Sequence, residues 1–213
     1  GNPTQEVHMK TTFKALSLVA AFALSAAACS DNATGPESDP AFVKGGNPQP
    51  SLPTIVDIVV TDDGEFDVLQ TVVIRSGLAG VLSGDRPFTV FAPTDAAFGD
   101  LFTLLGVPGD TPEEQADNAC PEATGCPDFV VTTVLYHVVN GRRYSNSVLS
   151  AKQLKTQIGD FLYPNGASLD TSCGNSANII TDVPGETFDI LASNGVIHVI
   201  DAVLLPKEVC DAL

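Results

Sequence analysis

The chain has 213 residues, a length that suits one domain, or two small ones, together with a leader and a tail. Hydrophobic residues make up 44% of the sequence and charged residues 17%, which is enough apolar material for a core and excludes an intrinsically disordered chain. Ten Lys and Arg residues stand against 26 Asp and Glu residues, and the net charge is -16. This charge excludes a nucleic-acid partner, because a phosphate backbone is bound through clustered cations.

The beginning of the chain has the composition of a leader. Residues 1–8 precede Met9, the only methionine, and we interpret them as an upstream extension. Residues 9–28 contain two lysines and then an apolar run that ends in small residues, which is the pattern of a secretory signal peptide. The apolar run has 14 residues, too few for the roughly 20 that a membrane-spanning helix needs.

Cys29 directly follows this run, and its surroundings resemble the processing site of a bacterial lipoprotein, in which the cysteine becomes the acylated N-terminus. The alternative is ordinary cleavage after Ala28, which leaves an exposed free thiol in an oxidising compartment. We favour lipidation of Cys29. Residues 29–51 are rich in Pro, Gly, Ser, Asn and Asp, so we expect them to form a flexible tether.

Hydrophobic periodicity predicts helices at the beginning of the folded part. One helical pattern starts at Thr54, and a second begins near Glu65. Residues 87–93 form a predicted buried strand. Thr94 and Asp95 follow this strand and are predicted to cap the next helix, because a hydroxyl and a negative charge are both favoured at a helix N-terminus.

Strands are predicted toward the end of the chain. The polar segment 106–128 is expected to be an ordered but irregular excursion, and residues 129–139 are expected to form a helix that becomes extended near His137. The later segments read as strands, and Asn194-Gly195 is the predicted turn of a hairpin, because both residues accept a positive φ. Helices and strands do not alternate regularly, which predicts an α+β fold.

Three segments together resemble the fasciclin domain, a module of extracellular and envelope adhesion proteins. They are FTVFAPTDAAF at residues 88–98, LYHVVNGRRYS at 135–145 and NGVIHVIDAVLLP at 194–206. The resemblance covers residues 52–209 and implies one α+β domain, in which helices pack on a β-wedge of two small sheets. Residues 210–213 are then a C-terminal tail. The resemblance also implies adhesion or partner binding, with no reaction and no cofactor.

The four cysteines beyond the leader allow three disulfide pairings. We favour Cys120 with Cys126, which closes a small loop, and Cys173 with Cys210, which ties a loop of the strand region to the C-terminal tail. The first pair lies in the segment 106–128, which is longer than we expect in the fasciclin family.

Candidate catalytic and metal-ligating side chains have structural interpretations. His137 and His198 are flanked by apolar residues and have no carboxylate or cysteine at ligand spacing, so we interpret both as hydrogen-bonded core residues. Asp95 is explained as part of a helix cap, and Asp201 is expected to pair with a donor at the end of the hairpin. The acidic segment 61–67 lacks the alternating ligands of an EF-hand calcium loop. We therefore predict no catalytic residue and no metal site.

Residues 129–159, called the acid-free segment below, contain no Asp or Glu although the chain is strongly acidic. The segment is either a solvated face that balances the acidity of its own protein, or a contact for an acidic partner, to which arginine is well suited. In animal members of the family the Tyr-His segment has been linked to receptor binding. The candidate partner-binding residues are Tyr136, His137, Arg142, Arg143, Tyr144, Lys152 and Lys155.

The sequence therefore favours a non-enzymatic adhesion or interaction module of the cell envelope or the extracellular space. Its partner is expected to be a protein or a polyanionic glycan, and the lipid anchor is expected to hold it at a membrane. The alternative is an envelope lipoprotein that binds a small ligand or a polysaccharide. A deep apolar pocket with a few convergent polar groups would mark that alternative.

Overall fold

The structure, a computed structural model, describes residues 52–61, 64–84, 86–180 and 189–212. All of these residues belong to one unit of the chain. The predicted leader, Cys29 and the predicted tether lie outside the described residues.

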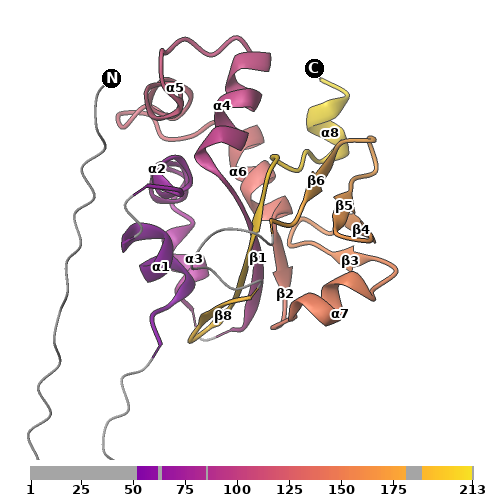
Figure 1. Ribbon diagram of the computed structural model, residues 1–213. Coiled ribbons are helices and arrows are strands. Elements are labelled where there is room, and N and C mark those ends of the chain that lie inside the picture. Colours follow the sequence, from indigo (N-terminus) through magenta and orange to yellow (C-terminus); the bar gives the residue numbers. More distant parts are fainter. Residues whose placement is uncertain (1–51, 62–63, 85, 181–188, 213) are drawn as a thin grey trace, which may run out of the picture. The chain divides into compact units, whose positions relative to one another are not determined.

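Two strands that are far apart in the sequence lie at the centre of the fold (Figure 1). β1 (Phe88–Pro93) and β8 (Gly195–Ile200) are parallel and pair over their whole length. β2 (Val138–Asn140) is antiparallel to β1, and β7 (Ile190–Ala192) is antiparallel to β8. The first sheet therefore has the strand order β2-β1-β8-β7.

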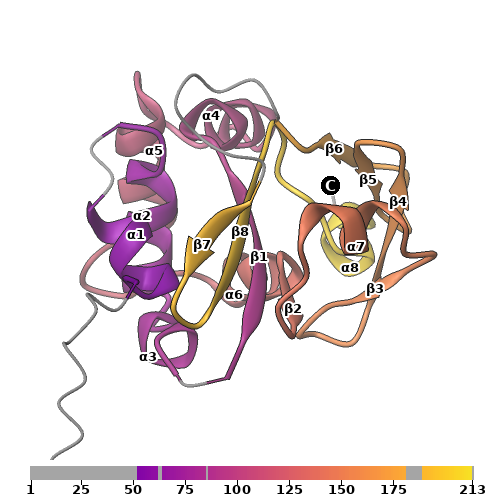
Figure 2. The same cartoon turned by 60° about the horizontal axis from the view of Figure 1, so that its bottom comes forward.

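A second sheet, antiparallel throughout, lies beside the first (Figure 2). Single bridges connect the two sheets, from Val139 to Thr156 and from Ile179 to Ile200. The two sheets form the wedge that the fasciclin resemblance implies. In spatial order the strands of the second sheet are β3 (Leu154–Lys155), β4 (Phe161–Asn165), β5 (Ser168–Asp170) and β6 (Ser176–Asn178).

Helices cover the first sheet and share one core with it. No helix within the described residues has both the length and the apolar composition of a membrane span. One short helix, α7 (Ser145–Leu149), instead contributes Val148 to the core between the two sheets. The helices that contribute to the first core are α1 (Ile55–Thr61), α2 (Asp67–Arg75), α3 (Ala79–Leu82), α4 (Asp95–Leu104), α5 (Pro112–Ala119), α6 (Asp128–Tyr136) and α8 (Lys207–Cys210).

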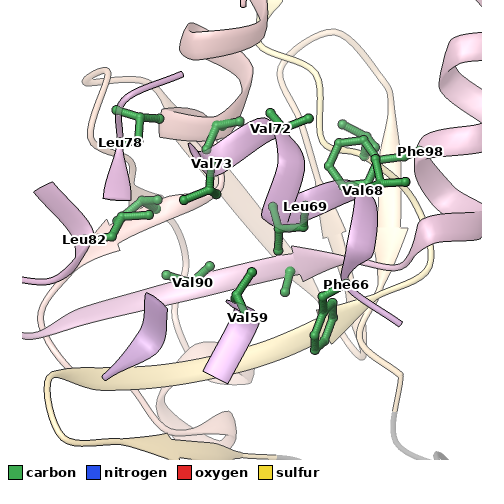
Figure 3. Packing of buried hydrophobic residues seen from close by; sticks show 14 of the residues in the cluster. Val59, Phe66, Val68, Leu69, Val72, Val73, Leu78, Leu82, Val90 and Phe98 are labelled. Atoms are coloured by element: carbon green, nitrogen blue, oxygen red, sulfur yellow. The ribbon is translucent and has the colours of Figure 1, made fainter. Parts of the chain in front are cut away.

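The central strands are buried on both faces, which explains their nearly continuous apolar sequence. Val90 of β1 belongs to the core under the helices, whereas the next residue, Phe91, belongs to the core between the sheets. Figure 3 shows side chains of α2, among them Leu69 and Val73, gathered over β1 at Val90. The α+β class and the two-sheet wedge predicted from the sequence are confirmed.

The residues after β1 cap two different helices. The Thr94 hydroxyl accepts the backbone N–H of Ala97 at 3.2 Å and so caps its own helix, α4, as predicted. The Asp95 carboxylate instead accepts the N–H groups of Asp67 at 3.3 Å and Val68 at 2.9 Å. Asp95 therefore caps α2, which lies beside α4, rather than the helix that it begins.

The segment 106–128 is more regular than predicted, because it contains α5. Thr111 accepts the N–H of Glu114 at 3.3 Å, and Pro112 occupies the first turn, where its missing N–H leaves no hydrogen bond unmade. The prediction of an irregular excursion was therefore wrong for this part. The predicted start of the tail, after Val209, lies inside α8.

Both disulfides of the structure have the pairing favoured from the sequence. Cys120 is joined to Cys126, and Cys173 to Cys210. The first disulfide is attached to α2 by Arg75, whose guanidinium donates to the Cys120 carbonyl oxygen at 2.7 Å. The second joins the end of the β5 region to α8.

The β7–β8 hairpin turns one residue earlier than predicted. Ser193 and Asn194 occupy the turn, while Gly195 pairs with Ala192 as the first residue of β8. Gly195 is required for a different reason than a positive φ. A Cβ at this position would collide with the backbone of Phe88 on the neighbouring strand.

Asn194 connects three elements through its buried side chain. Its Oδ1 accepts the N–H of Ile55 at 2.9 Å, at the start of α1. Its Nδ2 donates to the carbonyl oxygens of Leu82 at 2.6 Å and Gly84 at 3.1 Å, at the end of α3. The hairpin turn therefore fixes the position of two helices against the first sheet.

We predict that Asn194→Ala lowers the free energy of unfolding by about 2 to 4 kcal/mol, because it leaves buried backbone groups without partners. For a domain of this size the melting temperature should fall by roughly 5 to 15 °C. Asn146→Ala, at an exposed position of α7, is the matched control and should leave the melting temperature nearly unchanged. Equal melting temperatures of the two variants, measured by circular dichroism, would show that the Asn194 contacts contribute little to the free energy of unfolding.

Candidate functional site

Tyr136, at the end of α6, is buried and belongs to the core between the two sheets. Its hydroxyl donates to the carbonyl oxygen of Phe161 in β4 at 3.0 Å. Burial, with a smaller contribution from the nearby Asp160, raises the pKa of Tyr136 to about 12. The hydroxyl therefore stays protonated and structural, and the prediction that Tyr136 binds a partner was wrong.

His137 is also buried, and both of its ring nitrogens are used. Nε2 accepts the backbone N–H of Leu204 at 2.9 Å, so Nδ1 carries the proton and donates to the Thr133 carbonyl oxygen at 2.7 Å. Burial lowers the pKa of His137 to about 4, which keeps the ring neutral. The geometry fits the structural interpretation of His137 and contradicts its assignment as a partner contact.

His198 lies in β8 beside a serine and a carboxylate, a combination that invites comparison with a catalytic triad. Its ring stacks on Phe91, with 5.6 Å between the ring centroids, and its Nε2 lies 3.0 Å from the carbonyl oxygen of Arg143. Nδ1 lies 3.4 Å from the carboxylate of Asp189, which also accepts the N–H of Ser145 at 2.8 Å.

The Ser145 hydroxyl lies 3.3 Å from the Asp189 carboxylate and so contacts the acid rather than the histidine. A nucleophilic triad needs the opposite order, with the histidine on the hydroxyl. The cluster instead ties β8 and the residue before β7 to the beginning of α7. His198 therefore has the structural role that the sequence predicts.

Arg142 is exposed, but its guanidinium is engaged within the protein. One of its terminal nitrogens donates to the carbonyl oxygens of Ala192 at 3.0 Å and Ser193 at 2.8 Å. Arg142 therefore fastens the loop after β2 to the β7–β8 hairpin. One nitrogen of the Arg142 guanidinium is thus used within the fold, and the candidate role of Arg142 in partner binding stays a prediction.

The remaining candidates lie at the surface of the acid-free segment. Tyr144 is 42% exposed, and Lys152 and Lys155 are exposed as well. Lys155 and Arg143 also line an open surface depression of about 440 Å³, which we call the Arg143 groove. The residues that line this groove are Val139, Asn140, Arg143, Lys155, Thr156, Gln157, Ile158 and Gly159.

Asp201 has the partner that the sequence predicts. Its carboxylate accepts the backbone N–H of Asn178 at 2.7 Å and the side-chain amide of the same residue at 2.8 Å. Asp201 therefore joins the end of β8 to β6, and so connects the two sheets.

Among the described residues, one group of three acidic side chains, Asp67, Asp95 and Glu113, lies close enough to share an ion, with oxygens within 4.8 Å of one another. Each of them stands in the first turn of a helix, where the unpaired N–H groups favour a negative charge. Asp95 already accepts two of these N–H groups, and burial raises its pKa. The helix N-termini at which they stand account for the position of the three carboxylates.

Two apolar cavities of the described residues are small, whereas a wider and more open depression of about 490 Å³ lies between α6 and α8, at Leu105, Phe129 and Val209. The cavity between α1, α2, β1 and α6 holds about 20 Å³, and another beneath α4 and α6 holds about 30 Å³. Such a volume accommodates one or two water molecules. These cavities are not the deep apolar pocket that would mark a small-ligand module. The Arg143 groove, in contrast, is open, and its lining combines cationic, amide and hydroxyl side chains with Val139 and Ile158.

Comparisons with known proteins agree with this geometry. The family model of the fasciclin domain matches residues 64–206. The protein sll1735 of Synechocystis sp. is 34% identical over 155 residues, which cover 72% of this chain and 98% of that protein. Transforming growth factor-beta-induced protein ig-h3 of Sus scrofa is 30% identical over 162 residues, which cover 74% of this chain and 20% of that protein.

A solved structure of similar fold is the FAS1 domain pair from the insect cell adhesion molecule fasciclin I. Its TM-score is 0.55 at 17% sequence identity, and the match covers 74% of this chain and 52% of that chain. At this identity the likeness concerns the fold. It confirms the helices and the two small sheets of the wedge.

We predict that the protein loses stability as the pH falls from about 6.5 to about 4, because His137 is neutral in the folded state and protonated in the unfolded chain over this interval. The stabilisation is fully present above pH 6.5 and is lost below pH 4. Its total is about 3 kcal/mol, since each pH unit between the two pKa values corresponds to about 1.4 kcal/mol.

The measurement compares denaturant unfolding of the wild type and His137→Gln at pH 7.5 and pH 4.5. Glutamine offers a donor and an acceptor but does not titrate, whereas all other groups titrate alike in both proteins. The wild type should lose about 2 to 3 kcal/mol more than the variant over this interval. Equal losses would contradict a buried neutral His137.

Proposed function

Since the chain belongs to the fasciclin domain family, we propose that it is a non-enzymatic adhesion or interaction module of the cell envelope or the extracellular space. The observation that carries this proposal is the match of the family model over residues 64–206. The insect protein of similar fold is described as a cell adhesion molecule, and we extend that kind of role to this chain.

The use of the titratable side chains supports a binding role rather than a reaction. His137 and His198 each bind a backbone group of a distant segment, and Asp201 binds Asn178 across the two sheets. The polar side chains of the segments that resemble the fasciclin domain are therefore used in hydrogen bonds within the fold. The segments then act as a rigid support, and contact with a partner falls to exposed side chains around them.

We place the partner contact on the exposed part of the acid-free segment, at Tyr144, Lys152 and Lys155. Four of the ten Lys and Arg residues of the chain lie in this segment, which holds no Asp or Glu, whereas the net charge of the chain is -16. An acidic partner is therefore attracted here and repelled elsewhere. Such a contact weakens as salt rises, because the screening length shortens from about 10 Å at 0.1 M to about 3 Å at 1 M.

Location at the cell surface is the second part of the proposal. The signal-peptide pattern at residues 9–28 supports export, and the sequence around Cys29 supports a lipid anchor. Residues 29–51 would then hold the domain away from the membrane as a flexible tether.

We predict that the double charge reversal Lys152→Glu with Lys155→Glu reduces attachment several-fold, in an assay of beads coated with the full chain on extracellular matrix and on sibling cells. The matched control is Arg86→Glu with Lys207→Glu, which changes the net charge equally at exposed positions outside the acid-free segment. Attachment of the wild type should also fall between 0.1 M and 1 M salt.

Unchanged melting temperatures of both double variants establish that the fold is intact. Equal attachment by the wild type and the Lys152/Lys155 variant would reject this surface as the contact. Failure of wild-type beads to attach to either substrate would reject adhesion itself.

A further inference from the structure

The Arg143 groove combines cationic, amide and hydroxyl groups at the point where the two sheets meet. We propose that it binds a negatively charged sugar unit of an acidic polysaccharide. The inference rests on the proposed function and deepens it, because it names the chemical class of the partner and the site that recognises it.

Charge is the first argument. Arg143 and Lys155 line the groove, and none of the lining residues is an Asp or a Glu. The lining residues belong to the acid-free segment, in which every ionisable charge at neutral pH is a Lys or Arg. In a chain with a net charge of -16, this groove is a place where an anion meets two cations without a competing carboxylate in the lining.

The position of Arg143 is the second argument. Its N–H donates to the Thr89 hydroxyl at 2.9 Å, and its carbonyl oxygen lies 3.0 Å from Nε2 of His198, so β1 and β8 hold its backbone on both sides. The side chain starts from this fixed point. Its Nε is buried, and among the side chains of the described residues it is the buried polar atom without a hydrogen-bond partner.

A buried guanidinium nitrogen without an acceptor is unfavourable, and the internal contacts of the fold leave it in that state. The guanidinium fork matches the two oxygens of a carboxylate or a sulfate. An anion in the groove therefore meets the guanidinium of a residue whose backbone is held in place.

The amide pair on the other side of the groove is the third argument. The Gln157 side-chain amide donates to Oδ1 of Asn140 at 2.8 Å, and the Gln157 backbone N–H donates to the Val138 carbonyl oxygen at 2.8 Å. Both amides are thus held in place. Among the described residues, no hydrogen-bond partner takes the amide N–H donors of Asn140 or the side-chain acceptor of Gln157, and sugar hydroxyls both donate and accept.

The composition of the groove favours a sugar over an acidic peptide. Hot spots of protein interfaces are enriched in Trp, Tyr and Arg, and of these only Arg143 lines the groove. Its volume of about 440 Å³ lies within the range of small-molecule sites, roughly 300 to 1,000 Å³. One charged ring with its hydroxyls fits these dimensions and these polar groups.

The test measures binding of the full chain by isothermal titration calorimetry to four probes. These are oligogalacturonate, the same oligomer with every carboxylate methyl-esterified, dextran sulfate, and poly-L-glutamate. The variant is Arg143→Gln with Lys155→Gln, and the matched control is Arg86→Gln with Lys207→Gln, which removes the same charge from exposed positions outside the groove and outside the acid-free segment.

We expect the wild type to bind oligogalacturonate or dextran sulfate, and the tighter of the two identifies the anionic group. The groove variant should lose at least tenfold in affinity, whereas the control should change less than about twofold. The methyl ester should not bind. Lys155→Gln alone, at an exposed position, provides a second reading if Arg143→Gln lowers the melting temperature.

Equal losses in the groove variant and the control, no binding of either anionic sugar, or tighter binding of poly-L-glutamate would each overturn the proposal. If no sugar binds but the beads still attach, the proposal for the groove is rejected and the proposed adhesive role stands. If the sugar binds at the groove but the beads do not attach, the proposed adhesive role is rejected and the proposal for the groove stands.

Discussion

The parallel pairing of β1 with β8 is the interaction on which the rest of the structure depends. The paired residues of the two strands, such as Phe88 and Gly195, lie more than 100 residues apart in the sequence, so a long stretch of chain must be ordered before the strands meet. Burial of both faces of the pair offsets this loss of entropy. Helices cover one face and the second sheet covers the other. Asn194 and His198 then attach α1, α3 and the loop after β2 to this pair.

This arrangement separates the fold from its contacts with partners. Tyr136 and His137 join α6 to the second sheet and to the segment after β8, so the most recognisable part of the chain is internal. The side chains proposed to contact a partner lie at the surface between β2 and β4, next to the bridge from Val139 to Thr156. The backbone there is fixed by the two sheets, which gives the side chains of Arg143 and Lys155 a rigid base.

Much of the fold could be predicted from the sequence, because apolar periodicity marks β1, α4 and α6 and the spacing of the cysteines marks the disulfides. The orientation of single side chains could not. Tyr136 follows an apolar helix, but only the tertiary structure shows that its hydroxyl meets Phe161. The absence of acidic residues from the segment 129–159 indicated the region of the groove. The different roles of Arg142 and Arg143 could not be predicted, although the two are adjacent in the sequence. Arg142 donates to the β7–β8 hairpin, whereas Arg143 lines the groove.

Native-state hydrogen exchange of the full chain, followed by mass spectrometry over increasing denaturant, tests most directly whether the β1–β8 pair organises the fold. We expect the amides of β1 and β8 to exchange last, with the free energy of global unfolding, and those of β3 to β6 and α5 to exchange earlier through partial opening. Exchange of β1 or β8 at lower free energy than the second sheet would contradict this expectation.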